Sequence, residues 1–329
     1  MMRVDGSIKK VKVPEINAED TQAMLYDIMG DSQRKNFEEF SESDFSIELG
    51  DIARFRVNVF RQRRGMGAVF RVIPTEILSI EDLGLPQILH QITKREKGLV
   101  LVTGPTGSGK STTLASMIDL INRESEAHIL TIEDPVEFVH KSKKCLINQR
   151  EVGPHTLSFS NALRAALRED PDIILVGEMR DLETIQLALT AAETGHLVFG
   201  TLHTSSAPKT IDRIIDVFPP VQQAQIRAMI SESLQAVITQ TLCKKIGGGR
   251  AAALEIMLGT TAVRNLVREG KIHQLHSVIQ TSQGLGMCTM EASLIELFQK
   301  NVISTETLIE KSGNANILEE NDLAIDVNA

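Results

Sequence analysis

Hydrophobic and polar residues follow different patterns on the two sides of residues 74–86. Before them, a polar helical stretch over residues 17–40 opens at Asn17, a residue type well suited to cap a helix N-terminus. Three strand-like runs, separated by glycine-containing turns, then fill residues 45–73. This pattern predicts an antiparallel sheet with a helix packed against it.

Beyond residue 86, short apolar runs alternate with amphipathic helical stretches. Continuous apolar strands that alternate with helices are typical of a parallel sheet covered on both faces. We therefore expect an α/β domain, in which Gly195 ends a helix as its C′ residue. The predicted strands are 98–103, 128–133, 172–177 and 196–202, and the predicted helices begin near Gly109 and occupy 158–169 and 181–195.

The length of 329 residues exceeds what one hydrophobic core usually supports, so two domains are expected. The predicted boundaries are 1–73 for a small α+β domain, 74–86 for a linker, 87–312 for an α/β domain that ends in helices, and 313–329 for a tail. The tail is acidic and aperiodic, which predicts disorder.

Composition narrows the classes of partner and compartment. The net charge is -8 and aromatic residues make up 4%, without any Trp, which disfavours binding to a phosphate backbone or to stacked bases. Three cysteines lie far apart without a Cys-x-x-Cys pair, as in a cytoplasmic protein with reduced thiols and no zinc site. The longest apolar runs are far shorter than a membrane span.

Residues 104–111, GPTGSGKS, match the phosphate-binding pattern G-x-x-x-x-G-K-[ST]. They lie between a predicted strand and a predicted helix, where backbone N–H groups and the helix N-terminus can surround a phosphate. The alternative, a chance Gly/Ser turn, does not explain these flanking elements. We expect ATP and Mg²⁺ as ligands, with Lys110 on phosphate oxygens and Ser111 on the metal. The predicted nucleotide-binding residues are Gly104, Pro105, Thr106, Gly107, Ser108, Gly109, Lys110, Ser111 and Thr112.

Carboxylates stand at or near the ends of two later strands. Glu133 ends one strand, Glu137 lies just beyond it, and Glu178 ends the apolar run 172–177. Parallel strands open on one sheet edge, so these groups can meet the phosphate loop, where hydrolysis needs acids near metal and water. We expect catalytic roles for all three and Mg²⁺ contact, directly or through water, for Glu178. Solvated loop residues are the alternative, and Asp181 fits a helix N-cap better.

His196 and His203 stand at opposite ends of one predicted strand and therefore cannot share a single site. His203, at the C-terminal end, is the candidate for sensing a γ-phosphate. His196 is expected to pack against or orient a neighbouring element. A hydrogen-bonded filler role is the alternative for either histidine.

Residues 52–73 contain six arginines and no acidic residue. Strand alternation sends Phe55, Val57 and Val59 to one face and arginines, such as Arg54 and Arg56, to the other. Three interpretations stay open for this arginine face. It is a solvated surface, a nucleic-acid patch, or a set of arginines donated in trans to a neighbouring subunit's triphosphate.

Five segments in order resemble the motifs of the PilT-type retraction ATPases of type IV pili. They are GPTGSGKSTT, ILTIEDPVEF, LREDPDIILVGEMRD, TAAETGHLVFGTLHTSSAPKTIDRIIDVFP and TAVRNLVREGK, which resemble the Walker A, Asp box, Walker B, His box and C-terminal motifs. The resemblance runs from about Arg3 to about Leu308. It implies a homohexameric motor ATPase, cytoplasmic and peripheral at the inner-membrane pilus base. Each subunit would pair a PAS-like N-terminal domain with a RecA-like P-loop domain.

The resemblance also implies residue roles. Glu178 would be the catalytic Walker B acid and Glu137 a second acid near the water, with the division of roles between them left open. His196 and His203 would form the His box, and residues 262–269 would couple to the pilus machinery. Candidates to reach ATP on the adjacent subunit are Arg54, Arg56, Arg61 and Arg71. Partners would be an inner-membrane platform protein and a paralogous retraction ATPase. Members usually carry about one more strand and helix before the position of Met1, so the first domain is expected to be incomplete at its start.

Other functions compete with pilus retraction. A pilus-assembly or type II secretion ATPase usually carries a four-cysteine zinc site, which the missing Cys-x-x-Cys pairs disfavour. A P-loop nucleic-acid motor would need a basic channel and stacking aromatic side chains, which the composition opposes.

Overall fold

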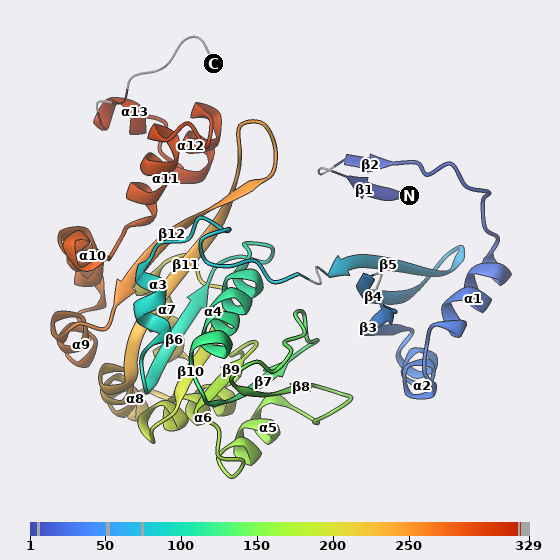
Figure 1. The fold of residues 1–329 in the computed structure, drawn as a ribbon, viewed down its shortest axis with the longest axis horizontal. Coiled ribbons are helices and arrows are strands. Elements are labelled where there is room, and N and C mark those ends of the chain that lie inside the picture. Colours follow the sequence, from blue (N-terminus) through green and yellow to red (C-terminus); the bar gives the residue numbers. More distant parts are fainter. Residues whose placement is uncertain (5–6, 51–52, 74–75, 322, 324–329) are drawn as a thin grey trace. The chain divides into compact units, whose positions relative to one another are not determined.

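The computed structural model describes residues 1–4, 7–50, 53–73, 76–321 and 323 (Figure 1). The chain forms two compact units, Met1–Thr75 and Glu76–Ala329. The boundary falls at the start of the segment that was predicted to be a linker. That prediction is wrong for most of the segment, because Ile80 and Leu85 are buried in the core of the second unit.

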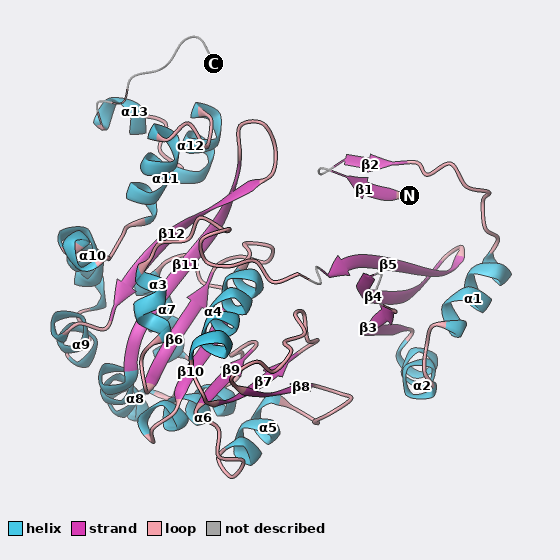
Figure 2. Ribbon diagram, in the orientation of Figure 1, coloured by secondary structure: helices cyan, strands magenta, loops and turns pink. Residues whose placement is uncertain are grey.

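The first unit contains two antiparallel sheets and two helices (Figure 2). Its elements are β1 Met2–Val4, β2 Ser7–Lys9, α1 Ala18–Asp27, α2 Asp31–Phe40, β3 Glu42–Leu49, β4 Ala53–Gln62 and β5 Gly65–Ile73. The strand order β3-β4-β5 and the predicted N-cap, Asn17, are as expected, since Asn17 Oδ1 accepts a hydrogen bond from Asp20 N. The turn between β4 and β5 lies at residues 63–64 rather than at the following glycines.

The core of the first unit forms on one face of its three-stranded sheet. Val57 and Val59 are fully buried and pack with Phe37 of α2 and Leu25 of α1. Their alternation along β4 explains why the intervening side chains point to the other face. This face carries Arg54 and other polar residues, as the sequence predicted.

The second unit is built on a seven-stranded sheet of order β12-β11-β6-β10-β9-β7-β8. All neighbours are parallel except β11 and β12, which form an antiparallel hairpin. The elements are α3 Ile88–Thr93, β6 Gly98–Thr103, α4 Lys110–Glu124, β7 His128–Glu133, β8 Leu146–Glu151, α5 Phe159–Ala166, β9 Ile173–Val176, α6 Leu182–Glu193, β10 Leu197–Leu202, α7 Ala207–Asp216, α8 Pro220–Ser233, β11 Leu234–Lys244, β12 Arg250–Leu258, α9 Thr261–Arg268, η1 Ile272–Gln274, α10 Leu275–Thr281, η2 Gln283–Leu285, α11 Met290–Gln299, α12 Thr305–Ser312 and α13 Ile317–Glu320.

The central strands are buried on both faces, which explains their unbroken apolar sequences. Along β6, Leu99 and Leu101 enter a core shared with α5 to α9, whereas Val100 and Val102 enter a core shared with α3 and α4. Every residue of β6 and β10 is buried. Two helical layers therefore sandwich the sheet, and the loops at its carboxyl edge are left to form a site.

The C-terminal helices form a separate small core with the β11–β12 hairpin. Leu294 of α11, Leu308 of α12 and Cys243 of β11 are buried there. Ile317 and Leu318 of α13 join the same core, so the prediction of disorder is wrong for this part of the tail. The rest of the predicted tail, residue 322 and residues 324–329, lies outside the described residues.

Candidate functional site

The predicted phosphate-binding loop connects β6 to α4. Gly104, Gly107 and Gly109 have φ values of 141°, 78° and 89°, a region that L side chains rarely adopt. A Cβ atom at Gly104 would also collide with the backbone oxygen of Gln240. Glycine is therefore required at Gly104 both by backbone conformation and by the close approach of β11.

The buried side chain of Gln240, on β11, forms hydrogen bonds to the phosphate loop and to the first turn of α4. The Gln240 Nε2 atom donates to the Ser108 carbonyl at 2.7 Å, and its Oε1 atom accepts from Thr113 Oγ1 at 2.7 Å. Gln240 is only 2% exposed. Gln240 was not predicted as a site residue, because its only signal in the sequence is an amide within a largely apolar stretch.

Lys110 and Ser111 occupy the first turn of α4, where the helix N-terminus favours anions. The Lys110 ammonium donates to the carbonyls of Gly104 and Pro105 at 2.8 and 3.1 Å, which places it at the mouth of the loop. Burial lowers the pKa of Lys110, and the negative charges of Glu178 and Glu137 oppose that shift. Both predicted acids are therefore close enough to the loop lysine to act on it electrostatically.

The strand β9 delivers Glu178 to the edge where the loop lies. Two backbone hydrogen bonds fix this corner, from Gly177 N to Ile132 O at 2.7 Å and from Met179 N to Thr201 O at 3.0 Å. The Glu178 carboxylate contacts His203 Nε2 at 2.9 Å and an Arg180 guanidinium nitrogen at 2.5 Å. The structure thus brings together Glu178 and His203, which were predicted separately as site residues, and adds Arg180.

The protonation state of Glu178 depends on its two partners. Partial burial would raise the pKa of the Glu178 carboxyl, but the hydrogen bond and charge of Arg180, together with His203, lower it below its usual value. Glu178 is therefore an ionised carboxylate at neutral pH. A carboxylate in this position can accept a proton or, through water, bind a cation.

The other predicted acids lie at the end of β7. Burial raises the pKa of Glu133, which accepts hydrogen bonds from Thr131 Oγ1 at 2.7 Å and from the backbone N of Glu137 at 3.4 Å. A cavity of about 40 Å³ separates Glu133 from Ser111 and is also lined by His140. Burial lowers the pKa of His140 to about 4, so this histidine is neutral.

His196 lies away from this site. The register of β10 against β6 pairs Leu197 with Gly98 and Leu202 with Thr103, so His196 precedes the amino end of β10. It is roughly 20 Å from His203 along a six-residue strand. His196 Nδ1 instead contacts the Ala191 carbonyl at 3.0 Å, which agrees with the packing role considered for it.

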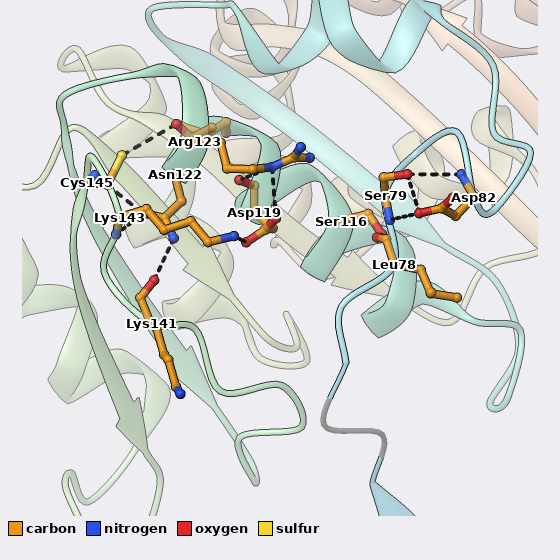
Figure 3. Close-up of polar contacts among 11 residues, drawn as sticks. Leu78, Ser79, Asp82, Ser116, Asp119, Asn122, Arg123, Lys141, Lys143 and Cys145 are labelled. Atoms are coloured by element: carbon orange, nitrogen blue, oxygen red, sulfur yellow. Dashed lines mark hydrogen bonds and ion pairs between the residues drawn. The ribbon is translucent and has the colours of Figure 1, made fainter.

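The helix that begins at the phosphate loop, α4, is anchored by side chains between Ser116 and Arg123 (Figure 3). Ser116 Oγ donates to the Leu78 carbonyl at 2.6 Å, close to the start of the second unit. Farther along α4, the fully buried Asn122 donates to the Lys141 carbonyl at 2.8 Å and accepts from Lys143 N at 2.9 Å. These contacts hold α4 rigidly against the segment that follows Glu137.

The predicted arginines belong to the first unit and have local partners. Arg54 forms an ion pair with Glu48 at 3.2 Å, and Arg56 pairs with Asp44 at 2.7 Å. The guanidinium of Arg61 lies 5.7 Å from the centre of the Phe37 ring, and Arg71 is exposed on β5, directly opposite Arg56. Arg54, Arg56 and Arg71 therefore share one face of the sheet, whereas Arg61 lies on the opposite face beside Phe37.

The C-terminal motif packs inward more than its sequence indicates. Val263 and Val267 of α9 are fully buried, and Arg264 donates to the backbone oxygens of Gly259, Glu232 and Leu234 at 2.7 to 3.0 Å. In this motif, Arg264 therefore has a structural role.

The residues at the sheet edge fit a magnesium ion bound together with a nucleotide. Within the described ranges, no group of three or more His, Cys, Asp or Glu side chains could hold a metal ion. Mg²⁺ in nucleotide sites usually takes only one or two protein oxygens and completes its shell with phosphates and water. The Ser111 hydroxyl and the Glu178 carboxylate are such oxygens. None of the helices in the described part of the chain has the length and apolar character needed to cross a membrane.

Comparison with known proteins gives consistent matches over most of the chain. The family model for type II/IV secretion system proteins matches residues 1–321. The type IV pilus retractation ATPase PilT of Pseudomonas aeruginosa is 62% identical over 312 residues, covering 95% of this chain and 91% of that protein. A twitching motility protein of Neisseria gonorrhoeae is 58% identical over 316 residues, covering 96% of this chain and 84% of that protein.

A solved structure supports the same assignment. The crystal structure of the pilus retraction motor PilT with bound ADP aligns with a TM-score of 0.89 and 51% identity, over 97% of this chain and 91% of that one. The predicted α/β fold, RecA-like with a mainly parallel central sheet and C-terminal helices, is thereby confirmed.

The environment of Glu178 predicts how ATP hydrolysis depends on pH. Arg180→Ala removes the largest influence that opposes burial while His203 remains, so the pKa of Glu178 rises. A carboxylate that must be ionised works above its pKa, so the acidic limb of the kcat–pH profile moves to higher pH. The measurement is kcat between about pH 4 and 8 at saturating Mg-ATP, so that the wild-type acidic limb is included, with the exposed Arg168→Ala as control. An unshifted acidic limb would show that Glu178 does not control this titration.

Proposed function

This chain belongs to the type II/IV secretion system protein family, and we propose that it is the ATPase that drives type IV pilus retraction. The observation that carries the proposal is the meeting of a complete phosphate loop with Glu178 and His203 at one sheet edge. This site occurs in a chain that is 62% identical, over 95% of its length, to a pilus retraction ATPase. ATP is the substrate, and its hydrolysis supplies the energy.

In this proposal, some residues of the chain bind the nucleotide and others accept the proton that hydrolysis releases. Backbone N–H groups of the loop and the Lys110 ammonium would hold the phosphates, and Ser111 and Glu178 would supply oxygens to Mg²⁺, Glu178 directly or through water. When bound, Mg²⁺ neutralises the charge that develops on the phosphate oxygens. Glu178, ionised and oriented by His203, accepts a proton from the attacking water, and Glu137 is the second acid beside it.

The motor is proposed to work as a homohexamer in the cytoplasm, at the inner-membrane base of the pilus. Arg54, Arg56, Arg61 and Arg71 would reach the triphosphate of the adjacent subunit. In support, all four come from two neighbouring strands of one small sheet. Force would pass to an inner-membrane platform protein, with a paralogous retraction ATPase as a further partner.

The direction of pilus movement is tested in the bacterium that encodes this chain. Lys110→Ala removes the charge that binds the phosphates, so retraction should stop while assembly continues. We expect cells with abundant surface pili, counted by electron microscopy, that have lost twitching on agar. The control is Lys141→Ala, whose exposed side chain lies outside the site. Lys110→Ala cells without surface pili would instead indicate an assembly ATPase.

Sharing of the site between subunits is tested by mixing variants. Arg56→Ala subunits lack the donated arginine, and Lys110→Ala subunits lack the loop lysine, so each alone should hydrolyse ATP poorly. A mixed ring contains some interfaces with both residues intact, so ATPase activity should rise above that of either parent. The control mixes Arg56→Ala with the Arg56→Ala/Lys110→Ala double variant, which restores no interface. Equal activity in both mixtures would rule out an Arg56 contribution in trans.

A further inference from the structure

The segment that carries Glu137 lies between β7 and β8 and is held by side chains from both strands. We define residues 134–140 as the acid loop. The two strands pair in parallel, with Thr131 opposite Gln149 and Glu133 opposite Glu151. The acid loop therefore begins at the carboxyl edge of the sheet, where β7 ends, and the chain must pass back to the opposite edge before β8 begins.

Three side chains bond to the backbone of the acid loop. Glu151 Oε2 accepts from Val136 N at 3.0 Å, and Glu133 Oε2 accepts from Glu137 N at 3.4 Å. Gln149 makes the remaining contacts, because its Oε1 accepts from His140 N at 2.8 Å and its Nε2 donates to the Phe138 carbonyl at 2.8 Å. Backbone groups immediately before and after Glu137 are thus fixed.

Gln149 also connects the two acids of this region. Its Nε2 atom donates to Glu133 Oε1 at 3.3 Å, and Glu133 in turn accepts from the backbone N of Glu137. The Gln149 amide therefore bonds to the acid loop at Phe138 and His140, on the C-terminal side of Glu137. It also bonds to the Glu133 carboxylate, which accepts from the Glu137 backbone N. Removing the amide would free the backbone on the C-terminal side of Glu137 and would take one of the two side-chain donors from Glu133, leaving Thr131.

The chemistry of these contacts selects an amide. The position must accept one hydrogen bond and donate two, and a glutamine side chain provides one carbonyl oxygen and two N–H donors. A glutamate could accept from His140 but could not donate, and it would place a second negative charge beside Glu133. A lysine or arginine could not accept from His140.

The acid loop also borders the phosphate site directly. The cavity of about 40 Å³ is lined by Ser111 from the first turn of α4, by Glu133, and by Phe138 and His140 of the acid loop. The negative charge of Glu137 acts on the Lys110 ammonium. A shift of this backbone would therefore move a carboxylate relative to the phosphates.

We propose that Gln149 is the positioning residue for Glu137, holding the acid loop so that the Glu137 carboxylate faces the nucleotide phosphates during hydrolysis. The inference rests on the proposed function, in which Glu137 is one of the two acids. Gln149 itself touches neither nucleotide nor water in this role. It acts through the backbone of Phe138 and His140 and through Glu133.

The first test replaces Gln149 with methionine, which has a similar length and volume but none of the hydrogen bonds. We expect kcat to fall by about 10- to 100-fold, since displacement of a catalytic group by about one ångström can cost on that order. KM for Mg-ATP and the Kd for a fluorescent ADP analogue should stay near wild-type values, because the phosphate loop is unchanged. Asn148→Ala is the matched control, since Asn148 is the preceding residue on β8 and contacts His128 instead.

The second test asks whether the loss passes through Glu137. Single-turnover hydrolysis is compared for Gln149→Met, Glu137→Gln and the double variant. If Gln149 acts by positioning Glu137, its substitution should cost little more once Glu137 has lost its charge. Full additivity of the two losses, or a wild-type kcat in Gln149→Met, would overturn the proposal.

The two tests separate this inference from the function on which it rests. Wild-type hydrolysis by Glu137→Gln would remove Glu137 from the catalytic site and would overturn both the role of Glu137 and its positioning by Gln149. Slow hydrolysis by Glu137→Gln with normal hydrolysis by Gln149→Met would overturn the positioning role alone. If Gln149→Met fails to bind the ADP analogue, Gln149→Glu replaces it. This variant keeps the acceptor for His140 but loses both donors, so the same fall in kcat is expected.

Discussion

The site depends on the parallel register of β6, β10, β9 and β7. Because Leu202 lies opposite Thr103, His203 emerges beside the first glycine of the phosphate loop. The next strand, β9, pairs with both β10 and β7 and ends at Val176, two residues before Glu178. Four strands that run in the same direction thus bring the loop, one histidine and the acids to one edge, although they are spread over about a hundred residues of sequence. A slip of one residue would turn the buried side chains to the wrong face.

The helix α4 makes that edge rigid. It starts with Lys110 and Ser111, binds the Leu78 carbonyl through Ser116, and holds the segment behind the acid loop through Asn122. Gln240 of β11 holds the phosphate loop through a hydrogen bond to the Ser108 carbonyl. Electrostatic catalysis requires groups that are already in place when charge develops, and this arrangement meets that requirement with buried hydrogen bonds.

Much of this arrangement was predictable from local patterns. The glycine loop, the strand end at Glu133 and the N-cap at Asp181 follow rules that act over a few residues, and the structure places these three as expected. Glu178 lies two residues beyond the end of β9, which stops at Val176. The separation of His196 from His203 followed from the length of one strand. These features depend on sequence-local chemistry, so the sequence alone was sufficient.

Other features depend on contacts between distant residues. The strand β8, with the polar sequence LINQRE, carries no apolar alternation and was not predicted, because two of its side chains, Gln149 and Glu151, bond to the acid loop rather than pack in a core. Gln240 contacts residues more than a hundred positions away. The supposed linker and tail are polar apart from a few apolar residues, such as Ile80 and Ile317, yet those few decide their packing.

The most direct test of this account is the isosteric substitution Glu178→Gln, which removes only the charge at the carboxyl edge. Mg-ATP binding and hydrolysis would be measured separately on the purified protein. The account predicts that the nucleotide still binds, whereas hydrolysis slows at least ~100-fold, as expected for loss of a catalytic base. Turnover near the wild-type rate would contradict the claim that converging strand ends place the catalytic carboxylate beside the phosphate loop.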